Sequence, residues 1–84
     1  MIWALEFTSK ARREISALDP PVRRQLEQDL RDLVQDPVLG KLLHGQLKGV
    51  RSWRSGDYRI LYGVQSTEWR IIVYWIAHRR EVYR

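Results

Sequence analysis

The hydrophobic pattern changes its period near the middle of the chain, and this change limits the possible folds more than any other feature. Before Asp36-Pro37, apolar residues recur at helical spacing, whereas after about Arg51 short runs of β-branched and aromatic residues are separated by turn signals. Helices and strands bury apolar side chains with different periods, so the two parts must form different elements that share a core. The sequence therefore predicts an α+β domain.

The first part predicts one short strand and two helices. Residues 2–7 are rich in β-favouring side chains, and Thr8 or Ser9 can cap the next helix with a side-chain oxygen. Asp19-Pro20-Pro21 ends this helix and begins the second, with the aspartate as N-cap. Because so few residues join the two helices, we expect an antiparallel pair. The predicted apolar stripes are Ala11, Ile15 and Leu18, then Val22, Leu26, Leu30, Leu33 and Val34.

The second part predicts a glycine-containing loop at residues 38–49, followed by strands at about 51–55, 58–64 and 69–77. Strands joined by short turns form an antiparallel meander. The expected element order is β-α-α-β-β-β, in a single domain spanning residues 1–84. In this arrangement the helical hairpin packs on one face of a small antiparallel sheet.

Composition excludes several kinds of site. The chain has no cysteine, so disulfides and thiolate metal sites are excluded, and His44 and His78 have no metal-ligand spacing. We therefore expect no metal and no other cofactor. The longest apolar run, residues 71–77, is too short for a membrane helix, and the N-terminus does not resemble a signal peptide. These features predict a cytoplasmic protein with no membrane partner.

Positive charge is concentrated in the second part of the chain. Residues 39–84 carry nine Lys/Arg and three Asp/Glu, a net charge of +6, whereas residues 1–38 carry six and seven, a net charge of −1. Seven of the nine aromatic residues also lie in the second part. A basic, aromatic-rich half is typical of proteins that bind nucleic acid, although basic domains without a specific anionic partner are also common.

Two arginines are expected to meet across the predicted hairpin. Gly56 suits the first central position of a type II′ turn, which places Arg54 opposite Arg59. Like charges in this position repel each other, so either solvent separates the two side chains or an anion bridges them. Alternation places the core on the other face of the sheet, with Trp53, Tyr58, Ile60, Tyr62 and Val64.

The C-terminal residues 77–84 form a second candidate cluster. His78 can titrate near neutral pH, and Tyr83 can donate a proton or stack on a base. Arg79 and Arg80 add hydrogen-bond donors. Charged tails are commonly only solvated ends, so this cluster matters for function only if it lies beside the arginine pair.

These side chains together suit RNA cleavage through the 2′-hydroxyl. The reaction needs a proton acceptor, a proton donor and positive charge around the phosphorane, and arginine suits only the last of these tasks because it stays protonated. His78 is the acid–base candidate, with Tyr83 as a possible acid. The electrostatic clamp would comprise Arg54, Arg59 and Arg79. Trp53 or Tyr58 would stack a base if either were not in the core.

Two stretches of the chain resemble the core signature of the RelE/ParE toxins. They run from Leu47 to Tyr62, around Arg54-Ser55-Gly56-Asp57-Tyr58-Arg59, and from Ile76 to Tyr83. The resemblance implies a helical hairpin on a small antiparallel sheet, encoded beside an antitoxin. RelE-like members cut mRNA in the ribosomal A site without a metal.

The resemblance also implies roles for individual residues. Arg59 matches the arginine that contacts the scissile phosphate, Arg79 the arginine beyond the last strand, and Tyr83 the tyrosine after Glu-Val. His78 resembles the C-terminal histidine that some members use. The expected additional contacts with RNA phosphates are Lys48, Arg51 and Arg80.

One departure keeps a second function open. The best-known RelE branch has two lysines where this chain has Val50 and Ser52, and Arg51 and Arg54 are the candidates to replace them. ParE-like members instead inhibit DNA gyrase by binding it, and a plain RNA-binding domain is a third alternative. For both toxin classes we expect an acidic, partly disordered antitoxin that covers the basic face. For the nuclease we also expect the ribosome and mRNA as binding partners.

Overall fold

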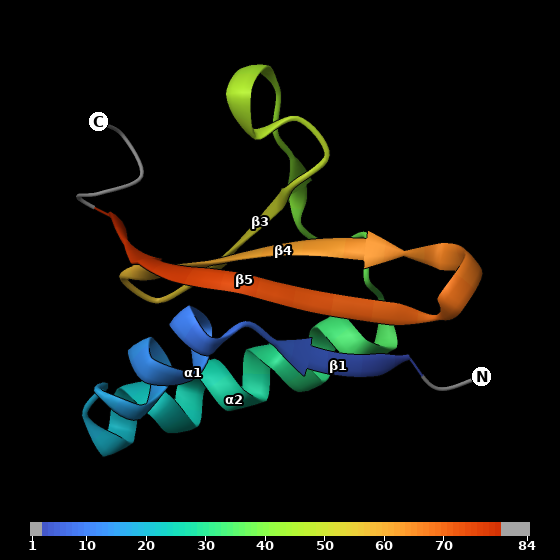
Figure 1. Ribbon diagram of the computed structural model, residues 1–84. Helices are drawn as coiled ribbons and strands as arrows, with labels where there is room; N and C mark the ends of the chain where they lie inside the picture. The colour runs from blue at the N-terminus through green and yellow to red at the C-terminus, as the bar shows by residue number, and fades with distance from the viewer. Residues whose placement is uncertain (1–2, 80–84) are drawn as a thin grey trace.

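Five strands and two helices form the described part of the chain, residues 3–79, in the computed structural model (Figure 1). The predicted succession of elements is confirmed, with one short strand, β2, added to it. Two 3-10 turns, Gly45–Leu47 and Ser66–Glu68, lie in the connections. In chain order the elements are β1 (Ala4–Phe7), α1 (Ser9–Ser16), α2 (Pro20–Gln35), β2 (Lys41–Leu42), β3 (Arg51–Ser55), β4 (Tyr58–Gln65) and β5 (Arg70–His78).

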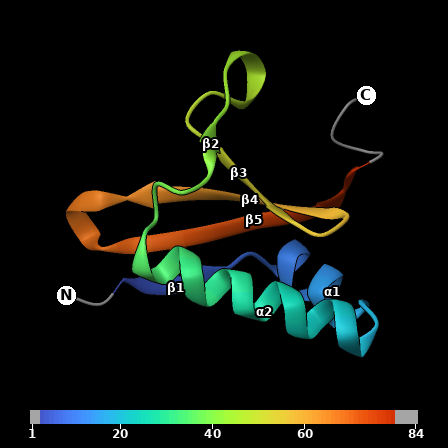
Figure 2. The same cartoon turned by 180° about the vertical axis from the view of Figure 1, so that it is seen from behind.

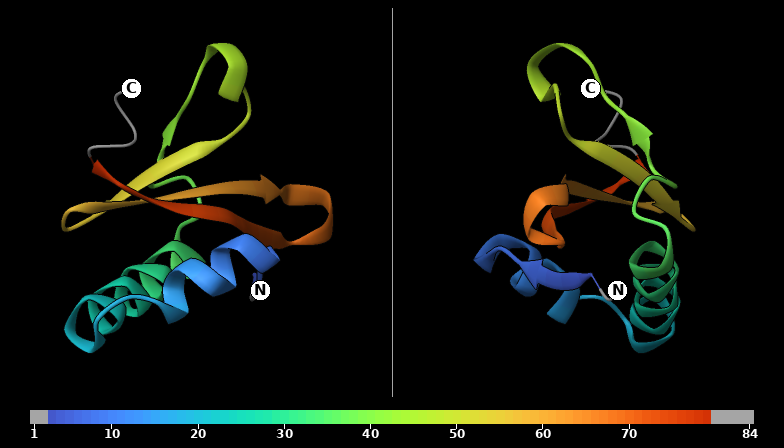
Figure 3. Two further views of the ribbon diagram at one scale, coloured as in Figure 1. Left: turned by 60° about the vertical axis from the view of Figure 1, so that its left-hand side comes forward. Right: turned by 90° about the vertical axis from the view of Figure 1, so that its right-hand side faces the viewer.

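The strands form one sheet in the order β1-β5-β4-β3-β2. Both helices lie on one face of this sheet, as Figures 1 and 2 show from opposite sides, which confirms the predicted α+β architecture. The segment 43–50, between β2 and β3, stands on the other side of the sheet (Figure 3). Within residues 3–79, neither helix is long and apolar enough to cross a membrane.

The sheet is mixed, which corrects the expectation of a purely antiparallel one. β1 runs parallel to β5, with the N–H of Ala4 bonded to the carbonyl of Trp69 and the N–H of Thr8 bonded to that of Val73. The remaining pairs are antiparallel. Only strands joined by tight turns must run antiparallel, and no such turn links β1 to β5. The short strand β2 lies within the predicted loop and pairs with the edge of β3.

Local sequence explains where the helices begin. The Thr8 hydroxyl accepts a hydrogen bond from the N–H of Ala11 at 3.1 Å, which confirms Thr8 as the N-cap of α1. Asp19 occupies the predicted N-cap position of α2, but its side chain makes no capping bond. Pro20 and Pro21 form the first positions of that helix and have no N–H, so fewer donors need a cap there.

The core lies between the helical hairpin and the sheet. The side chains predicted to face it do so: Ile60 and Tyr62 are fully buried, and Trp53, Tyr58 and Val64 pack against the buried cluster. The opposite face is not bare either, since Ser52 and Leu61 are 5% and 1% exposed. The buried cluster comprises Ala11, Leu26, Leu30, Leu33, Ile60, Tyr62, Ile71, Val73 and Ile76.

Tyr62 ties the end of α2 to the sheet. Its hydroxyl donates to the carbonyl of Pro37 at 2.7 Å and accepts from the N–H of Gly40 at 2.9 Å. Burial raises the pKa of this hydroxyl. A Cβ on Gly40 would lie only 2.5 Å from the same oxygen, so the close approach requires a glycine.

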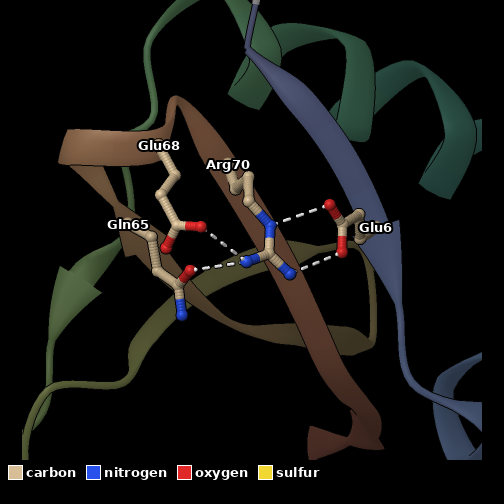
Figure 4. A network of polar contacts seen from close by, with 4 residues as sticks. All are labelled: Glu6, Gln65, Glu68 and Arg70. Carbon is tan, nitrogen blue, oxygen red and sulfur yellow. Dashed lines mark hydrogen bonds and ion pairs between the residues drawn. The ribbon is translucent and has the colours of Figure 1, made fainter.

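A polar network holds β1 against the start of β5 (Figure 4). The Arg70 guanidinium donates two hydrogen bonds to the Glu6 carboxylate, both at 2.8 Å, and further bonds to Gln65 and Glu68. These bonds hold the pKa of Glu6 below its ordinary value, with the Arg70 charge as a further cause. The network lies at the end of β5 away from His78. Because it joins Glu6 on β1 to Arg70 on β5, it acts as a clamp between these two strands, which we call the Glu6–Arg70 clamp.

Candidate functional site

The hairpin between β3 and β4 has the predicted turn and register. Gly56 has a φ of 60°, and the non-glycine residue with positive φ in the described chain is Trp69, so Asp57 does not share this conformation. A single positive φ at the first central position is typical of a type II′ turn. Arg54 pairs with Arg59 across the strands, as predicted.

Three arginines line one hollow at this end of the sheet. Arg54 is exposed and its Nε donates to the carbonyl of Gly56 at 3.1 Å, while Arg59 is half-buried on the neighbouring strand. Arg79 approaches from the end of β5. The hollow has a volume of about 160 Å³ and is lined by Arg54, Gly56, Tyr58, Arg59 and Arg79. The proposed electrostatic clamp is therefore assembled from three different segments.

Backbone and side-chain contacts bring Arg79 to the hairpin. Its N–H donates to the carbonyl of Asp57 at 2.7 Å. Its guanidinium lies 3.8 Å from the Asp57 carboxylate, and both side chains are more than half exposed. The three guanidiniums around the hollow repel one another, and the Asp57 carboxylate offsets part of this repulsion.

His78 lies on the other side of the sheet from the arginine pair. It pairs with Tyr58 in the β4–β5 ladder, whereas Arg59 pairs with Ala77, and successive side chains of a strand point to opposite faces. The His78 and Tyr58 rings meet edge to face, with centroids 5.2 Å apart. His78 therefore contacts Tyr58, which lines the hollow, and is not itself among the residues that line it.

Of the other predicted phosphate contacts, Arg51 and Lys48 do not line the hollow. Arg51 lies on the helix side of β3, opposite Tyr62, and donates to the carbonyl of Gly40 at 2.8 Å. Lys48 is exposed in segment 43–50, which stands away from the sheet. The predictions for Arg80 and Tyr83 fall outside the described residues.

Sequence reasoning treated Asp57 only as a turn residue and missed its contact with Arg79. A signal was present, because Asp57 is the one acidic residue between Asp36 and Glu68.

His44 is exposed and lies away from these contacts, as expected. Within residues 3–79, no group of three or more His, Cys, Asp or Glu side chains is arranged to hold a metal ion.

Comparison with known proteins agrees with this geometry. A family model described as "ParE toxin of type II toxin-antitoxin system" matches residues 5–83, which is nearly the whole chain. The chain belongs to the RelE/ParE family of toxins. The resemblance drawn from the hairpin and the C-terminal stretch is thereby confirmed.

Two curated RelE/ParE relatives come from Mycobacterium tuberculosis. Toxin RelG is 33% identical over 86 residues, and the alignment covers 100% of this chain and 99% of the relative. Toxin RelE is 41% identical over 46 residues, which covers 55% of this chain and 47% of the relative. The first similarity therefore extends over the full length of both proteins.

Solved structures of RelE/ParE toxins share the fold. The toxin–antitoxin complex RelBE2 from M. tuberculosis matches with a TM-score of 0.87 and 30% identity, covering 94% of this chain and 100% of that chain. The isolated E. coli RelE toxin matches with a TM-score of 0.77 and 28% identity, covering 96% and 90%. The archaeal RelE–RelB complex from Pyrococcus horikoshii, at 21% identity and a TM-score of 0.81, shows the same fold.

The departure from the best-known RelE branch has a structural counterpart. Ser52, at one of the two positions expected to hold lysine, is 5% exposed. Val50, at the other, is half-buried. Of the two candidate substitutes, only Arg54 lines the hollow, since Arg51 is directed to Gly40. Among residues 3–79 of this RelE/ParE toxin, the positive charge that lines the hollow thus comes from arginines.

Proposed function

We propose that the chain is a ribosome-dependent endoribonuclease that cleaves mRNA in the A site and so inhibits translation. The observation that supports this most is the gathering of Arg54, Arg59 and Arg79 around one hollow. Guanidinium groups that converge on one point suit a phosphate oxyanion, because each offers charge-assisted hydrogen bonds in a planar fork. The full-length similarity to a toxin named RelG, and the similarity of about half of the chain to one named RelE, support the same class of activity.

In this mechanism the arginines act on the phosphorane. Attack by the 2′-hydroxyl on the adjacent phosphorus adds negative charge to the non-bridging oxygens, and preorganised positive charge stabilises that state. Arg59 contacts the scissile phosphate, and Arg54 and Arg79 hold it from the two sides of the hairpin. The products are a 2′,3′-cyclic phosphate and a 5′-hydroxyl.

Proton transfer needs other groups, since arginine stays protonated. His78 stays the proposed acid–base group, although it lies on the face away from the arginine pair and meets the lining of the hollow at the Tyr58 ring. Tyr83 is the proposed acid or stacking group from the C-terminal residues. The half-buried position of Tyr58 also allows its ring to contact a base at the rim of the hollow.

The decisive experiment is primer extension on mRNA translated in the presence of purified protein. Wild type should produce new ends inside codons. Arg59→Ala should cut about 10²- to 10³-fold more slowly, as is common when one oxyanion donor is removed. Arg31→Ala, an exposed arginine on α2, is the matched control and should cut like wild type. Equal cutting by wild type and Arg59→Ala would exclude the proposed site.

Gyrase inhibition is the second candidate function. It is favoured by the family model, which describes a ParE toxin, and by the absence of lysine at residues 50 and 52. Unaltered RNA in the primer-extension assay, together with inhibited DNA supercoiling by purified gyrase, would establish this function instead. The assay therefore separates the two candidates.

We also propose an antitoxin as the binding partner. RelBE2 of M. tuberculosis, which shares this fold, was solved as a toxin–antitoxin complex. Exposed apolar side chains near β2 and the net charge of +6 over residues 39–84 fit a partner that is both apolar and acidic. The exposed residues are Val38, Leu39, Leu42 and Leu47. Failure of this chain and its cognate antitoxin to form a complex at micromolar concentration would contradict the proposal.

A further inference from the structure

Asp57 is an acidic residue at a site otherwise suited to an anion. It occupies the tip of the hairpin that carries two of the three arginines of the hollow, and it contacts the third. The chain from residue 37 to residue 67 contains five Lys/Arg residues and no other Asp or Glu. A carboxylate here repels the phosphates of RNA, so its presence at this point needs a reason.

Turn chemistry alone supplies one reason. Aspartate and asparagine are both common in hairpin turns, where the short side chain bonds to nearby backbone. The structure adds a second, because Asp57 contacts Arg79 twice: its carbonyl accepts the Arg79 N–H at 2.7 Å, and its carboxylate faces the guanidinium at 3.8 Å. The first contact brings the end of β5 to the hairpin, and the second orients the side chain. Asparagine would preserve the turn and the backbone bond but not the charge.

The pair has the character of an exchangeable contact. The Arg79 and Asp57 side chains are 59% and 64% exposed, and exposed ion pairs at this distance are weak. An incoming phosphate, whose oxygens accept several hydrogen bonds from one guanidinium, competes well with such a partner. Exchanging Asp57 for the substrate phosphate therefore costs Arg79 little free energy.

We infer that Asp57 is a positioning residue that holds Arg79 at the rim of the hollow and releases it to the substrate phosphate. This inference rests on the proposed action on RNA. The Asp57 carboxylate then has two effects that can be measured separately. It weakens binding of RNA through repulsion, and it speeds the chemical step by keeping Arg79 in place. Removing the charge of Asp57 should therefore lower both KM and kcat. A simple loss of folding would not lower KM.

The variant that tests this is Asp57→Asn, with Glu68→Gln as the matched control. Glu68→Gln removes the same charge, but from the Arg70 network at the other end of β5. Binding is measured by fluorescence anisotropy with a short 2′-O-methyl RNA, which cannot be cleaved. Asp57→Asn should bind this RNA roughly two- to five-fold more tightly than Glu68→Gln, a change expected for one exposed charge contact. Equal binding by the two variants would overturn the inference.

Cleavage on programmed ribosomes gives the second readout. The rate at saturating protein reports kcat, and the half-saturating concentration reports KM. Asp57→Asn should lower both relative to Glu68→Gln, and Asp57→Glu should restore part of kcat. The kcat effect should vanish in an Arg79→Ala background, because Asp57 acts through Arg79. A kcat effect that persists there overturns the positioning role.

The two measurements also separate this inference from the proposed function. If wild type cuts no RNA, the nuclease is wrong and the positioning role of Asp57 falls with it, so the binding comparison then reports only whether the Asp57 charge repels RNA. If wild type cuts and Arg59→Ala does not, the nuclease stands, and equal KM and kcat for Asp57→Asn and Glu68→Gln reject the role of Asp57. Thermal unfolding of each variant by circular dichroism excludes loss of the fold as the cause.

Discussion

Trp69 has a backbone conformation that large side chains rarely adopt. Its φ is 54° and its ψ is 45°, in the left-handed region, at the end of the turn that precedes β5. Its carbonyl accepts the N–H of Ala4, and its ring packs against Trp3 with centroids 4.8 Å apart. The packing and the bond to β1 thus offset the strain of the backbone.

Substitutions at Trp69 can separate strain from packing. Trp69→Ala and Trp69→Gly both remove the ring, but only glycine adopts the left-handed conformation without steric cost. We predict that Trp69→Gly is more stable than Trp69→Ala by about 1 kcal/mol, the usual cost of this conformation for a residue with a Cβ. Urea unfolding followed by circular dichroism measures the difference. Equal stability, or a more stable alanine variant, would show that the backbone is not strained.

Individual residues also show which parts of the site were predictable. The register of Arg54 and Arg59 follows from Gly56 and from strand alternation, both of which are local. The bond from Arg51 to Gly40 depends on how the chain closes after α2, which no local pattern indicates. The local pattern therefore predicted the pair, whereas the surroundings of Arg51 depend on contacts distant in sequence, and the role of these residues toward RNA stays a prediction.

At the scale of elements, the clamp between β1 and β5 makes stability depend on pH. Hydrogen bonds from Arg70 hold the pKa of Glu6 below its ordinary value of 4.5. A group whose pKa is lowered by folding stabilises the folded state above its unfolded pKa and loses that contribution as pH falls through its folded pKa. The stabilisation by the Glu6–Arg70 clamp should therefore be complete above about pH 4.5 and be lost in more acid solution.

The corresponding prediction concerns Glu6→Gln. This variant should be less stable than wild type at pH 7, and the difference should shrink as the pH falls below 4.5. Glu27→Gln, which changes an exposed glutamate on α2, should not alter the pH dependence. Urea unfolding between pH 3 and 7 compares the three proteins. A constant difference between Glu6→Gln and wild type over this range would contradict the role of the clamp.

A bulge in β5 explains why the position of His78 was not predictable. Leu61 pairs with Trp75 but its neighbour Tyr62 pairs with Val73, so Tyr74 is an extra residue in the ladder. Uninterrupted alternation from residue 71 would put His78 on the same face as the arginines. The extra residue reverses the faces beyond it, as a bulge does. Nothing in the apolar run 71–77 marks where this bulge lies.

At the scale of the whole molecule, the fold brings distant segments to one end of the sheet. The β3–β4 hairpin supplies Arg54 and Arg59, and the end of β5 supplies Arg79, while the helical hairpin covers the opposite face (Figure 2). The element types and their order were predictable because each depends on a local period. The parallel pairing of β1 and the added strand β2 were not, because they depend on contacts between segments far apart in sequence.

The central claim is that Arg54, Arg59 and Arg79 bind a single phosphate. It is tested most directly by NMR of arginine Nε–H groups during titration with a non-cleavable 2′-O-methyl dinucleotide. The three signals should shift together along one saturation curve, while Arg31 on α2 stays unchanged. Shifts with different midpoints, or no shift at Arg59, would contradict the claim that these residues form one site.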